Sequence, residues 1–241
     1  MGKRLKSQRR GKGSPTFKAT QNAAFDVNYI SYDDEQKEGV IKGQIIRVLN
    51  DRGKTAVLAE VLFENKKKEI VIAAEGLVEG QELEYGKKAG IDIGNVLPVR
   101  ELPEGCPVFN IELIPGDGGK FIRSAGSYAL VGSKEKGRIY LKLPSGKTIA
   151  LLPECRATIG NAAGGGRKEK PLVKAGKAFH LMKSLSRPYP IVRGVAMNPP
   201  SHPFGGSQHH PGKSKSVSRH APPGRKVGAI ASKRTGRKKK G

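Results

Sequence analysis

The chain has 241 residues, of which 36% are hydrophobic, and it carries 45 Lys and Arg against 21 Asp and Glu. Its formal net charge of +24 indicates a polyanionic partner, because such a surface attracts phosphate. Two distant cysteines, Cys106 and Cys155, form no Cys-x-x-Cys pair, which argues against a disulfide framework or a zinc ribbon and fits a reducing cytoplasm. No apolar run approaches the ~18–20 residues of a membrane span, so we expect a chain that is neither secreted nor anchored.

The positive charge is concentrated at the two ends. All 21 acidic residues lie between Asp26 and Glu169, and the same span holds 21 Lys and Arg. Of the other basic residues, 7 precede Asp26 and 17 follow Glu169. A neutral body with positive ends predicts tails that enter a charged partner, instead of a single basic face.

Residues 1–25 are predicted to be a basic, irregular extension. The cations of residues 1–18 stand among Gly and Ser with no acid and little that can pack, so this segment alone should be disordered. The alternative is a solubilising or nuclear-targeting tail. Next come a candidate strand at residues 24–30 and an acidic turn at residues 33–35.

Residues 26–96 have the pattern of a small β domain. Apolar residues in 40–49 and 56–63 flank a turn at 50–53, which predicts a hairpin, and residues 70–72 supply another strand. Four or five short strands in roughly 60 residues fit either a small closed barrel or a small open sheet.

Residues 97–175 are predicted to form a second β domain after a joint at residues 97–103. Turn residues separate strand candidates at intervals of roughly ten residues, which indicates a second small barrel or a sandwich. The candidate strands are residues 108–114, 121–123, 128–131, 138–143 and 148–152.

Residues 176–241 are predicted to be a basic, irregular extension. The composition already changes after Gly160, where glycines and cations replace the apolar alternation. Only residues 175–184 are suited to helix, for one turn or two. A compact domain would not tolerate so much structureless chain, so an outside partner must order it.

The segment Arg193–Gly206 joins the foldable body to this extension. Its prolines and glycines exclude a helix and a central strand, which leaves an ordered loop or a disordered linker. An ordered loop would present Asn198, His202 and Phe204 in a fixed geometry.

Three blocks in the same order resemble the universal large-subunit ribosomal protein family conventionally numbered two, ribosomal protein L-two. They are Met197-Asn198-Pro199-Pro200-Ser201-His202-Pro203-Phe204-Gly205-Gly206, Glu154-Cys155-Arg156-Ala157-Thr158-Ile159-Gly160, and Lys226-Val227-Gly228-Ala229-Ile230-Ala231 with Arg234-Thr235-Gly236-Arg237. Phe204, where bacterial members usually carry a histidine, resembles archaeal or eukaryotic members. The pair Pro200-Ser201 departs from the aliphatic residue and aspartate expected there.

This resemblance covers nearly the whole chain and implies a mainly β fold with an OB-like barrel and then an SH3-like barrel. It also implies a structural constituent of the large ribosomal subunit that binds ribosomal RNA near the peptidyl-transferase centre, beside neighbouring ribosomal proteins in the cytoplasm. Help in subunit joining and transfer-RNA placement is implied as well. The peptidyl-transfer chemistry is then placed in RNA, so no enzyme activity and no cofactor are expected.

Other chemistries have weaker support in the sequence. Gly53-Lys54-Thr55 and Gly146-Lys147-Thr148 resemble the end of a phosphate-binding loop, but Val48 and Leu141 stand where that loop needs its first glycine. Four histidines of the carboxyl-terminal extension match no familiar metal-ligand spacing, so no metal is expected. An RNA-processing enzyme or a non-specific RNA chaperone with basic arms remains the alternative function.

The candidate RNA contacts combine cations set among small residues, which bring the backbone close to phosphate, with a few groups that can meet a base. Tyr189 is a further candidate for base stacking. The predicted RNA-binding residues are Arg4, Lys6, Arg9, Arg10, Lys12, Arg156, Arg167, Arg193, Asn198, His202, Phe204, Lys213, Lys215, Arg219, Arg225, Lys226, Arg234 and Arg237.

Overall fold

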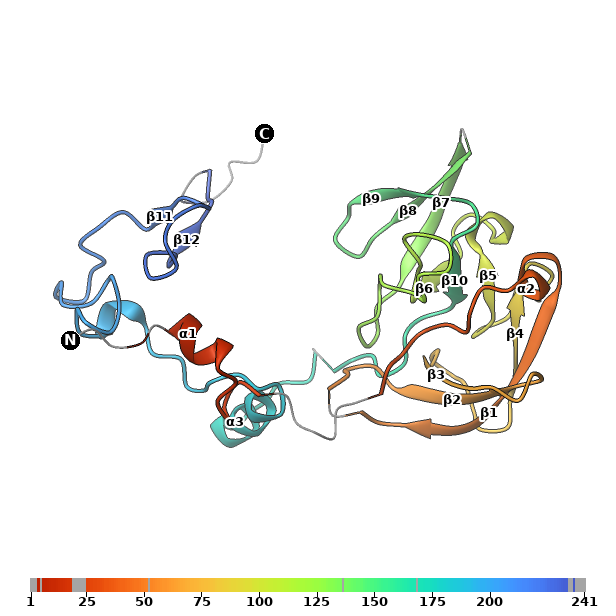
Figure 1. The fold of residues 1–241 in the computed structure, drawn as a ribbon, viewed down its shortest axis with the longest axis horizontal. Coiled ribbons are helices and arrows are strands. Elements are labelled where there is room, and N and C mark those ends of the chain that lie inside the picture. The colour runs from red at the N-terminus through yellow and green to blue at the C-terminus, as the bar shows by residue number, and fades with distance from the viewer. Residues whose placement is uncertain are drawn as a thin grey trace. The chain divides into compact units, whose positions relative to one another are not determined.

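The computed structural model describes residues 4, 6–18, 25–51, 53–135, 137–167, 169–233 and 236, with residues 6 and 7 described by their backbone alone. The chain divides into two compact units (Figure 1). Residues 20–172 form one, here called the barrel unit, and residues 1–19 together with 173–241 form the other, here called the basic unit.

A ten-stranded sheet runs through the barrel unit in the order β3-β2-β1-β4-β5-β10-β6-β7-β8-β9. Neighbouring strands are antiparallel except for β4 and β5. The strands are β1 (Val40–Leu49), β2 (Leu58–Phe63), β3 (Lys68–Ile72), β4 (Glu82–Gly86), β5 (Val96–Pro98), β6 (Pro107–Phe109), β7 (Ala129–Glu135), β8 (Arg138–Lys142), β9 (Thr148–Leu151) and β10 (Arg156–Ile159). Two short helices accompany them, α2 (Asp34–Glu38) and η1 (Val99–Glu101).

The first half of the sheet, β1 to β5, closes on itself through the residues that follow β10. The Ala163 amide donates to the Ala73 carbonyl at 2.9 Å, and Ala74 bridges Ala162. Because the chain after β10 thus pairs with the chain after β3, the free edge of the sheet is covered. This closure confirms the OB-like barrel over the open sheet.

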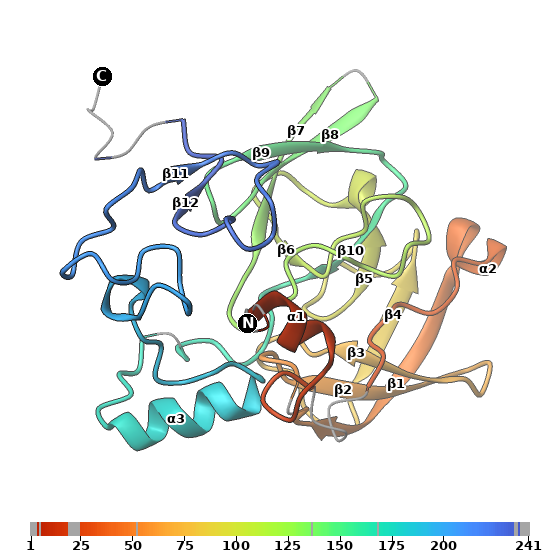
Figure 2. The ribbon, with the colours of Figure 1, turned by 60° about the vertical axis from the view of Figure 1, so that its left-hand side comes forward.

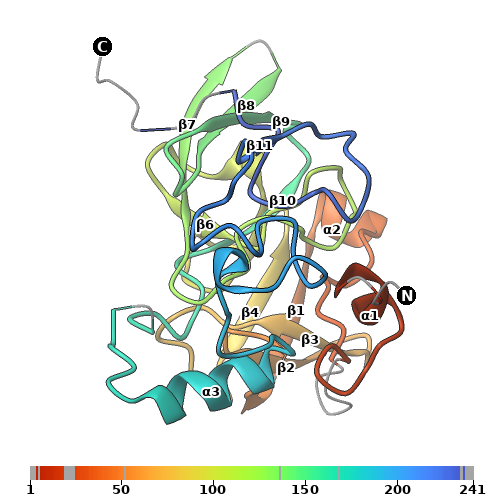
Figure 3. The ribbon, with the colours of Figure 1, turned by 90° about the vertical axis from the view of Figure 1, so that its left-hand side faces the viewer.

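In the second half, β10 is followed in the sheet by β6, β7, β8 and β9, and short turns join β7 to β8 and β8 to β9 (Figure 3). Alternate residues of β8 point inward, so Ile139 and Leu141 are buried with Val108 and Ala157 in one apolar cluster. The arrangement agrees with the predicted SH3-like barrel.

Strand β10 belongs to both halves. It pairs with β5 through Ala157 and Leu97, and with β6 through Thr158 and Phe109. All four residues of β10 are buried. The segment 97–103, expected as a joint, therefore begins inside a continuous sheet and goes on into η1.

A buried ion pair lies at the start of β10. Arg156 is 1% exposed, and its Nη2 lies 2.7 Å from the Glu112 Oε1. The Glu112 Oε2 also accepts the Arg156 backbone amide at 2.9 Å. On its other side, the guanidinium donates through Nη1 to the Ile30 carbonyl at 2.9 Å and to the Gln36 Oε1 at 2.8 Å. One side chain thus joins β10, the 112–118 loop and the start of α2.

Aromatic rings cover the same guanidinium. Its carbon lies 5.1 Å from the ring centroid of Tyr29 and 4.6 Å from that of Tyr32, within the range of cation–π attraction. Burial raises the pKa of the Tyr29 phenol, which forms a hydrogen bond with the Thr158 hydroxyl. These contacts hold residues 25–33 against the barrels without any strand.

The basic unit has little regular structure and almost no core. Its elements are α1 (Lys6–Gly11), α3 (Ala175–Ser184), η2 (Gly194–Ala196), β11 (Ser216–Val217) and β12 (Ala229–Ile230), of which the last two pair in parallel (Figure 2). Among its described residues, only Phe204 and Val217 are buried apolar side chains. No helix in the described part of the chain is long and apolar enough to cross a bilayer.

Several local predictions are wrong. The described residues 25–30 of the candidate strand 24–30 form no strand, and residue 24 lies outside the described residues. Of the candidate strand at residues 108–114, only the residues at the end of β6 are in a strand. The candidate strand at residues 121–123 forms only a single β-bridge, from Phe121 to Ile111. In the extensions, α1 replaces part of an expected irregular arm, and α3 runs for ten residues.

We expect Arg156→Met to lower the free energy of unfolding of the barrel unit by about 3–5 kcal/mol, because it leaves the Glu112 carboxylate buried without its partner. Urea unfolding of the full chain measures this. The control is Arg100→Met, since Arg100 and its partner Glu101 have side chains that are 55% and 34% exposed, and such a pair contributes about 1 kcal/mol or less. Equal effects of the two variants would contradict a central role for the buried pair.

Candidate nucleic-acid interface

The segment Met197–Gly206 is a closed loop of the basic unit. The Gly206 amide donates to the Met197 carbonyl at 3.1 Å, which joins its two ends. Inside it, the Ser201 amide donates to the Asn198 carbonyl at 2.9 Å, and the Gly205 amide donates to the His202 carbonyl at the same distance. The sequence left an ordered loop and a linker open, and the structure has the loop.

Two glycines are required for this closure. A Cβ on Gly205 would overlap the backbone carbonyl oxygens of Met197 and Asn198. Gly206 has a φ of +81°, which a side chain disfavours, and a Cβ there would overlap the Pro199 ring. The loop can therefore form only with Gly-Gly at its end.

His202 holds the loop from inside. Its Nδ1 accepts a hydrogen bond from the Phe204 amide at 3.1 Å. The imidazole lies directly over Gly194 of η2, where any Cβ would overlap the ring. Because Nδ1 accepts, it carries no proton in this arrangement, and the ring acts as a structural acceptor.

Phe204 anchors the loop to the rest of the basic unit. It is 7% exposed, and its ring edge reaches to 3.0 Å from the position that a Cβ would take on Gly228. Gly228 leads into β12, and the Ala229 amide donates to the Lys215 carbonyl at 2.9 Å. The prediction that Phe204 contacts RNA is therefore corrected: a buried ring is not available for a base.

Most of the predicted cations are exposed. This group comprises Arg4, Arg9, Arg10, Lys12, Arg167, Arg193, Lys213, Lys215, Arg219 and Lys226, and Asn198 is exposed with them. Arg225 is half-buried, with its Nη2 donating to the Ser214 carbonyl at 3.5 Å. The side chain of Lys6, and Arg234 and Arg237, lie outside the described residues.

Arg156 is the second correction to the predicted set. All of its guanidinium nitrogens have partners inside the barrel unit, and it is 1% exposed. A phosphate could reach it only by displacing Glu112 and Gln36. Arg156 therefore belongs to the fold and not to the interface.

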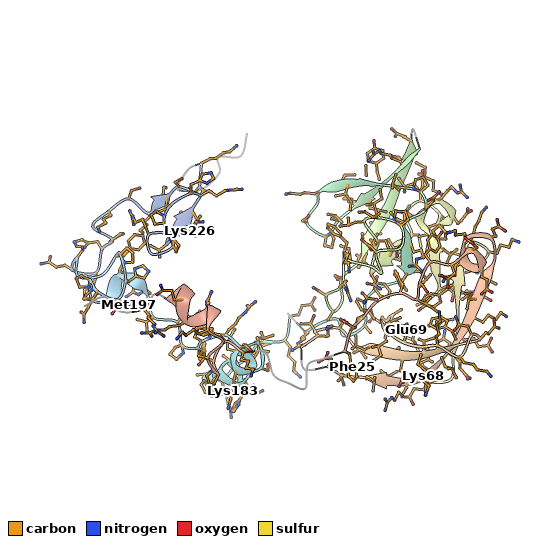
Figure 4. The ribbon with its side chains drawn as sticks, viewed as in Figure 1. Phe25, Lys68, Glu69, Lys183, Met197 and Lys226 are labelled. Atoms are coloured by element: carbon orange, nitrogen blue, oxygen red, sulfur yellow. The ribbon has the colours of Figure 1, made fainter. Side chains whose placement is uncertain are left out.

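The basic unit cannot neutralise its own charge. It contains no Asp or Glu, and every ion pair of the described residues lies in the barrel unit. Its cations therefore repel one another at close range, and a polyanion removes that repulsion. Figure 4 shows such side chains in this unit, among them Lys183 on α3 and Lys226 in the segment before β12.

Comparison with known proteins identifies the family. Residues 2–85 match the family model described as "Ribosomal Proteins L2, RNA binding N-terminal domain", and residues 92–226 match "Ribosomal Proteins L2, C-terminal domain". The chain belongs to the ribosomal protein L2 family. Large ribosomal subunit protein uL2 of Methanococcus maripaludis strain C5 is 54% identical over 240 residues, covering 99% of this chain and all of the relative.

A second relative, large ribosomal subunit protein uL2 of Methanothermobacter thermautotrophicus, is 48% identical over 241 residues, covering 99% of this chain and all of the relative. Both are archaeal, which agrees with the archaeal or eukaryotic type that Phe204 indicated for this chain. The two L2 family matches together span the described parts of α1, both barrels and the Met197–Gly206 loop.

The sequence reasoning missed one part of the interface. The amino-terminal arm belongs to the same unit as the carboxyl-terminal extension: the Ser186 hydroxyl donates to the Lys18 carbonyl at 2.8 Å. The Arg10 guanidinium carbon lies 5.4 Å from the Phe17 ring centroid. A signal was present, since both segments lack acids and Phe17 is the only aromatic residue of the first 20.

We expect Gly205→Ala to disorder the Met197–Gly206 loop, because the added methyl cannot coexist with the two carbonyl oxygens. Amide exchange of the chain bound to large-subunit RNA should show faster exchange over residues 194–206 and unchanged protection in the barrel unit. The control is Gly176→Ala in α3, where nothing lies within 4 Å of the new Cβ and where helix propensity improves by up to about 1 kcal/mol. Unchanged exchange in the first variant would contradict the closed loop.

Proposed function

We propose that this chain is a structural component of the large ribosomal subunit that binds ribosomal RNA and supports its assembly. The names of the relatives support the setting in the ribosome. The observation that carries the proposal is the basic unit, which contains no Asp or Glu and buries only two apolar side chains among its described residues. Such a unit gains its fixed conformation from contacts with RNA phosphates.

The two units would then do different work. The barrel unit, with nearly balanced charge and a full core, is a preformed protein surface suited to neighbouring ribosomal proteins as well as RNA. The basic unit supplies the cations that offset phosphate repulsion as the RNA compacts. By function we divide the chain into an extension (1–25), two barrels (26–96 and 97–175) and an RNA-penetrating extension (176–241).

The Met197–Gly206 loop is the part that we place near the peptidyl-transferase centre. Its hydrogen-bonded closure, with the His202 Nδ1 engaged inside the loop, supports a positioning role and not proton transfer. Roles of this protein in subunit joining and in transfer-RNA placement belong to the same proposal. They would use the exposed side chains around the loop, such as Asn198 and Arg193.

An RNA-processing enzyme is the rival function. The second sequence that resembled a phosphate-binding loop is a hairpin turn, because the Gly146 amide donates to the Leu143 carbonyl at 2.9 Å. Among the described residues, no three His, Cys, Asp or Glu side chains are grouped to hold a metal ion. No observation favours that rival over the structural role.

We expect replacement of four exposed cations of the basic unit by glutamine to flatten the salt dependence of RNA binding. The four are Lys213, Lys215, Arg219 and Lys226. If each contacts one phosphate, the slope of log K against log salt should fall in magnitude by roughly 3 to 4. Filter binding of the full chain to large-subunit RNA at several salt concentrations measures this.

The charge-matched control replaces four exposed lysines of the barrel unit, Lys66, Lys67, Lys68 and Lys88. The barrel unit contains acidic residues, among them Glu64 and Glu69 beside three of these lysines in the sequence, so the slope should change less. Equal slopes for the two variants would mean that the basic unit is not the main phosphate-binding part.

We expect His202→Ala to leave the barrel unit folded and to impair ribosomes that contain it, because the Phe204 amide loses its acceptor. Such a loss costs about 0.5–1.5 kcal/mol, enough to shift the loop. His202→Asn supplies an oxygen acceptor and does not titrate near pH 7, so it should restore assembly and peptide-bond formation. If both variants assemble normally but slow the chemical step with an altered pH profile, His202 acts in proton transfer instead.

A further inference from the structure

The basic unit contains a groove that the functions above do not use. A cavity of about 400 Å³ lies between α3 and the segment that follows it, lined by Phe179, Lys183, Arg187 and Tyr189 together with Pro15 and Pro190. This volume lies within the range of small-molecule sites, roughly 300–1,000 Å³. The groove combines aromatic and proline walls with two cations.

The local structure explains why these residues meet. Phe179 and Lys183 are four residues apart on α3 and therefore share one face of the helix. After Ser184 the chain folds back, with the Arg187 amide donating to the Met182 carbonyl at 2.9 Å. The residues that follow this turn, among them Tyr189, then form the opposite wall.

The aromatic walls are accessible. Phe179 is 46% exposed and Tyr189 is 37% exposed, and no residue of α3 is buried. A helix that leaves its apolar residues uncovered lacks a partner for that face. The barrel unit buries rings such as that of Phe63 in its core. In the basic unit, Phe204 and Val217 are the only buried apolar side chains among the described residues.

The groove continues toward the amino-terminal arm. A second cavity of about 670 Å³ shares Arg187 and Pro190 with the first and adds Arg9, Arg10 and Phe17. A single occupant of both cavities would therefore be elongated, with flat or apolar parts and repeated negative charge. No Asp or Glu lies anywhere in this unit, so the charge complementarity favours an anion over an apolar protein segment.

We propose that this groove binds an unstacked nucleotide of single-stranded RNA, with the base against Phe179 and Tyr189 and its phosphates at Lys183 and Arg187. The inference rests on the proposed function and refines it. Aromatic rings bind bases by stacking on their faces, and flanking cations bind the backbone. A duplex cannot supply this ligand, because its bases are already stacked.

The test uses the full chain and two probes, a ten-nucleotide single-stranded RNA of mixed sequence and the same strand annealed to its complement. Phe179→Leu and Tyr189→Leu keep an apolar side chain but remove the ring. We expect each to weaken binding of the single strand about ten-fold and to leave duplex binding and both salt slopes unchanged. Lys183→Gln should lower the single-strand slope by about 0.7, the value for one phosphate contact.

Tyr128→Leu is the matched control. Tyr128 is 44% exposed, like the two groove rings, but it belongs to the barrel unit and does not line the groove. This variant should bind both probes like the unchanged chain. A single strand carrying 4-thiouridine should also crosslink to peptides containing Phe179 or Tyr189.

The results separate two failures. If the unchanged chain binds with a steep salt slope but both leucine variants bind the single strand equally well, the groove inference is overturned while the proposed function stands. If the 4-thiouridine strand crosslinks to the chain but never to peptides containing Phe179 or Tyr189, RNA does not occupy the groove, and the inference is likewise overturned. If the unchanged chain shows no salt-dependent RNA binding, the proposed function itself fails.

Discussion

The buried ion pair of Arg156 and Glu112 constrains the barrel unit more than any other contact, because two charges removed from water must satisfy each other completely. The two side chains also form hydrogen bonds with segments that are distant in the sequence. Glu112 accepts hydrogen bonds from backbone amides of its own loop, including that of Gly118 at 3.1 Å, while Arg156 donates to the Ile30 carbonyl and to the side-chain oxygen Oε1 of Gln36. A displacement of either barrel half would leave a buried charge without its hydrogen-bond partners. The pair therefore favours a single arrangement of the two halves around β10.

The basic unit follows the opposite principle. Its arginines and lysines have no acidic side chains to pair with, and the two buried apolar side chains among its described residues cannot offset the entropy of ordering so many residues. The local structure of this unit depends on close packing of the backbone at glycines and prolines. Gly205, for example, packs against the Asn198 carbonyl, and Gly228 packs against the Phe204 ring. The same type of side chain, arginine, thus stabilises one unit from inside and prepares the other for an external anion.

The sequence predicts the parts of the fold that have a local signal. The hairpin of β1 and β2 follows from apolar alternation around a turn, and the closed loop follows from its proline and glycine content together with the family resemblance. Strand β10 had no such signal, because all four of its residues are buried and its sequence does not alternate between apolar and polar side chains. Arg156 was misassigned for a related reason: its carboxylate partner lies 44 residues away, and nothing beside it in the sequence distinguishes it from the exposed arginines.

The sequence marks both chain ends as basic and free of acids but does not show that they contact each other, and this contact has a physical consequence for binding. Because Ser186 contacts the Lys18 carbonyl, and because Arg9 and Arg187 line the same cavity, the amino-terminal arm and the carboxyl-terminal extension form one surface. Ordering either segment alone would remove the residues that the other segment contributes to the lining of the groove. Binding of RNA by one end therefore lowers the entropy cost of ordering the other, and the two extensions should gain structure together as the RNA folds around them.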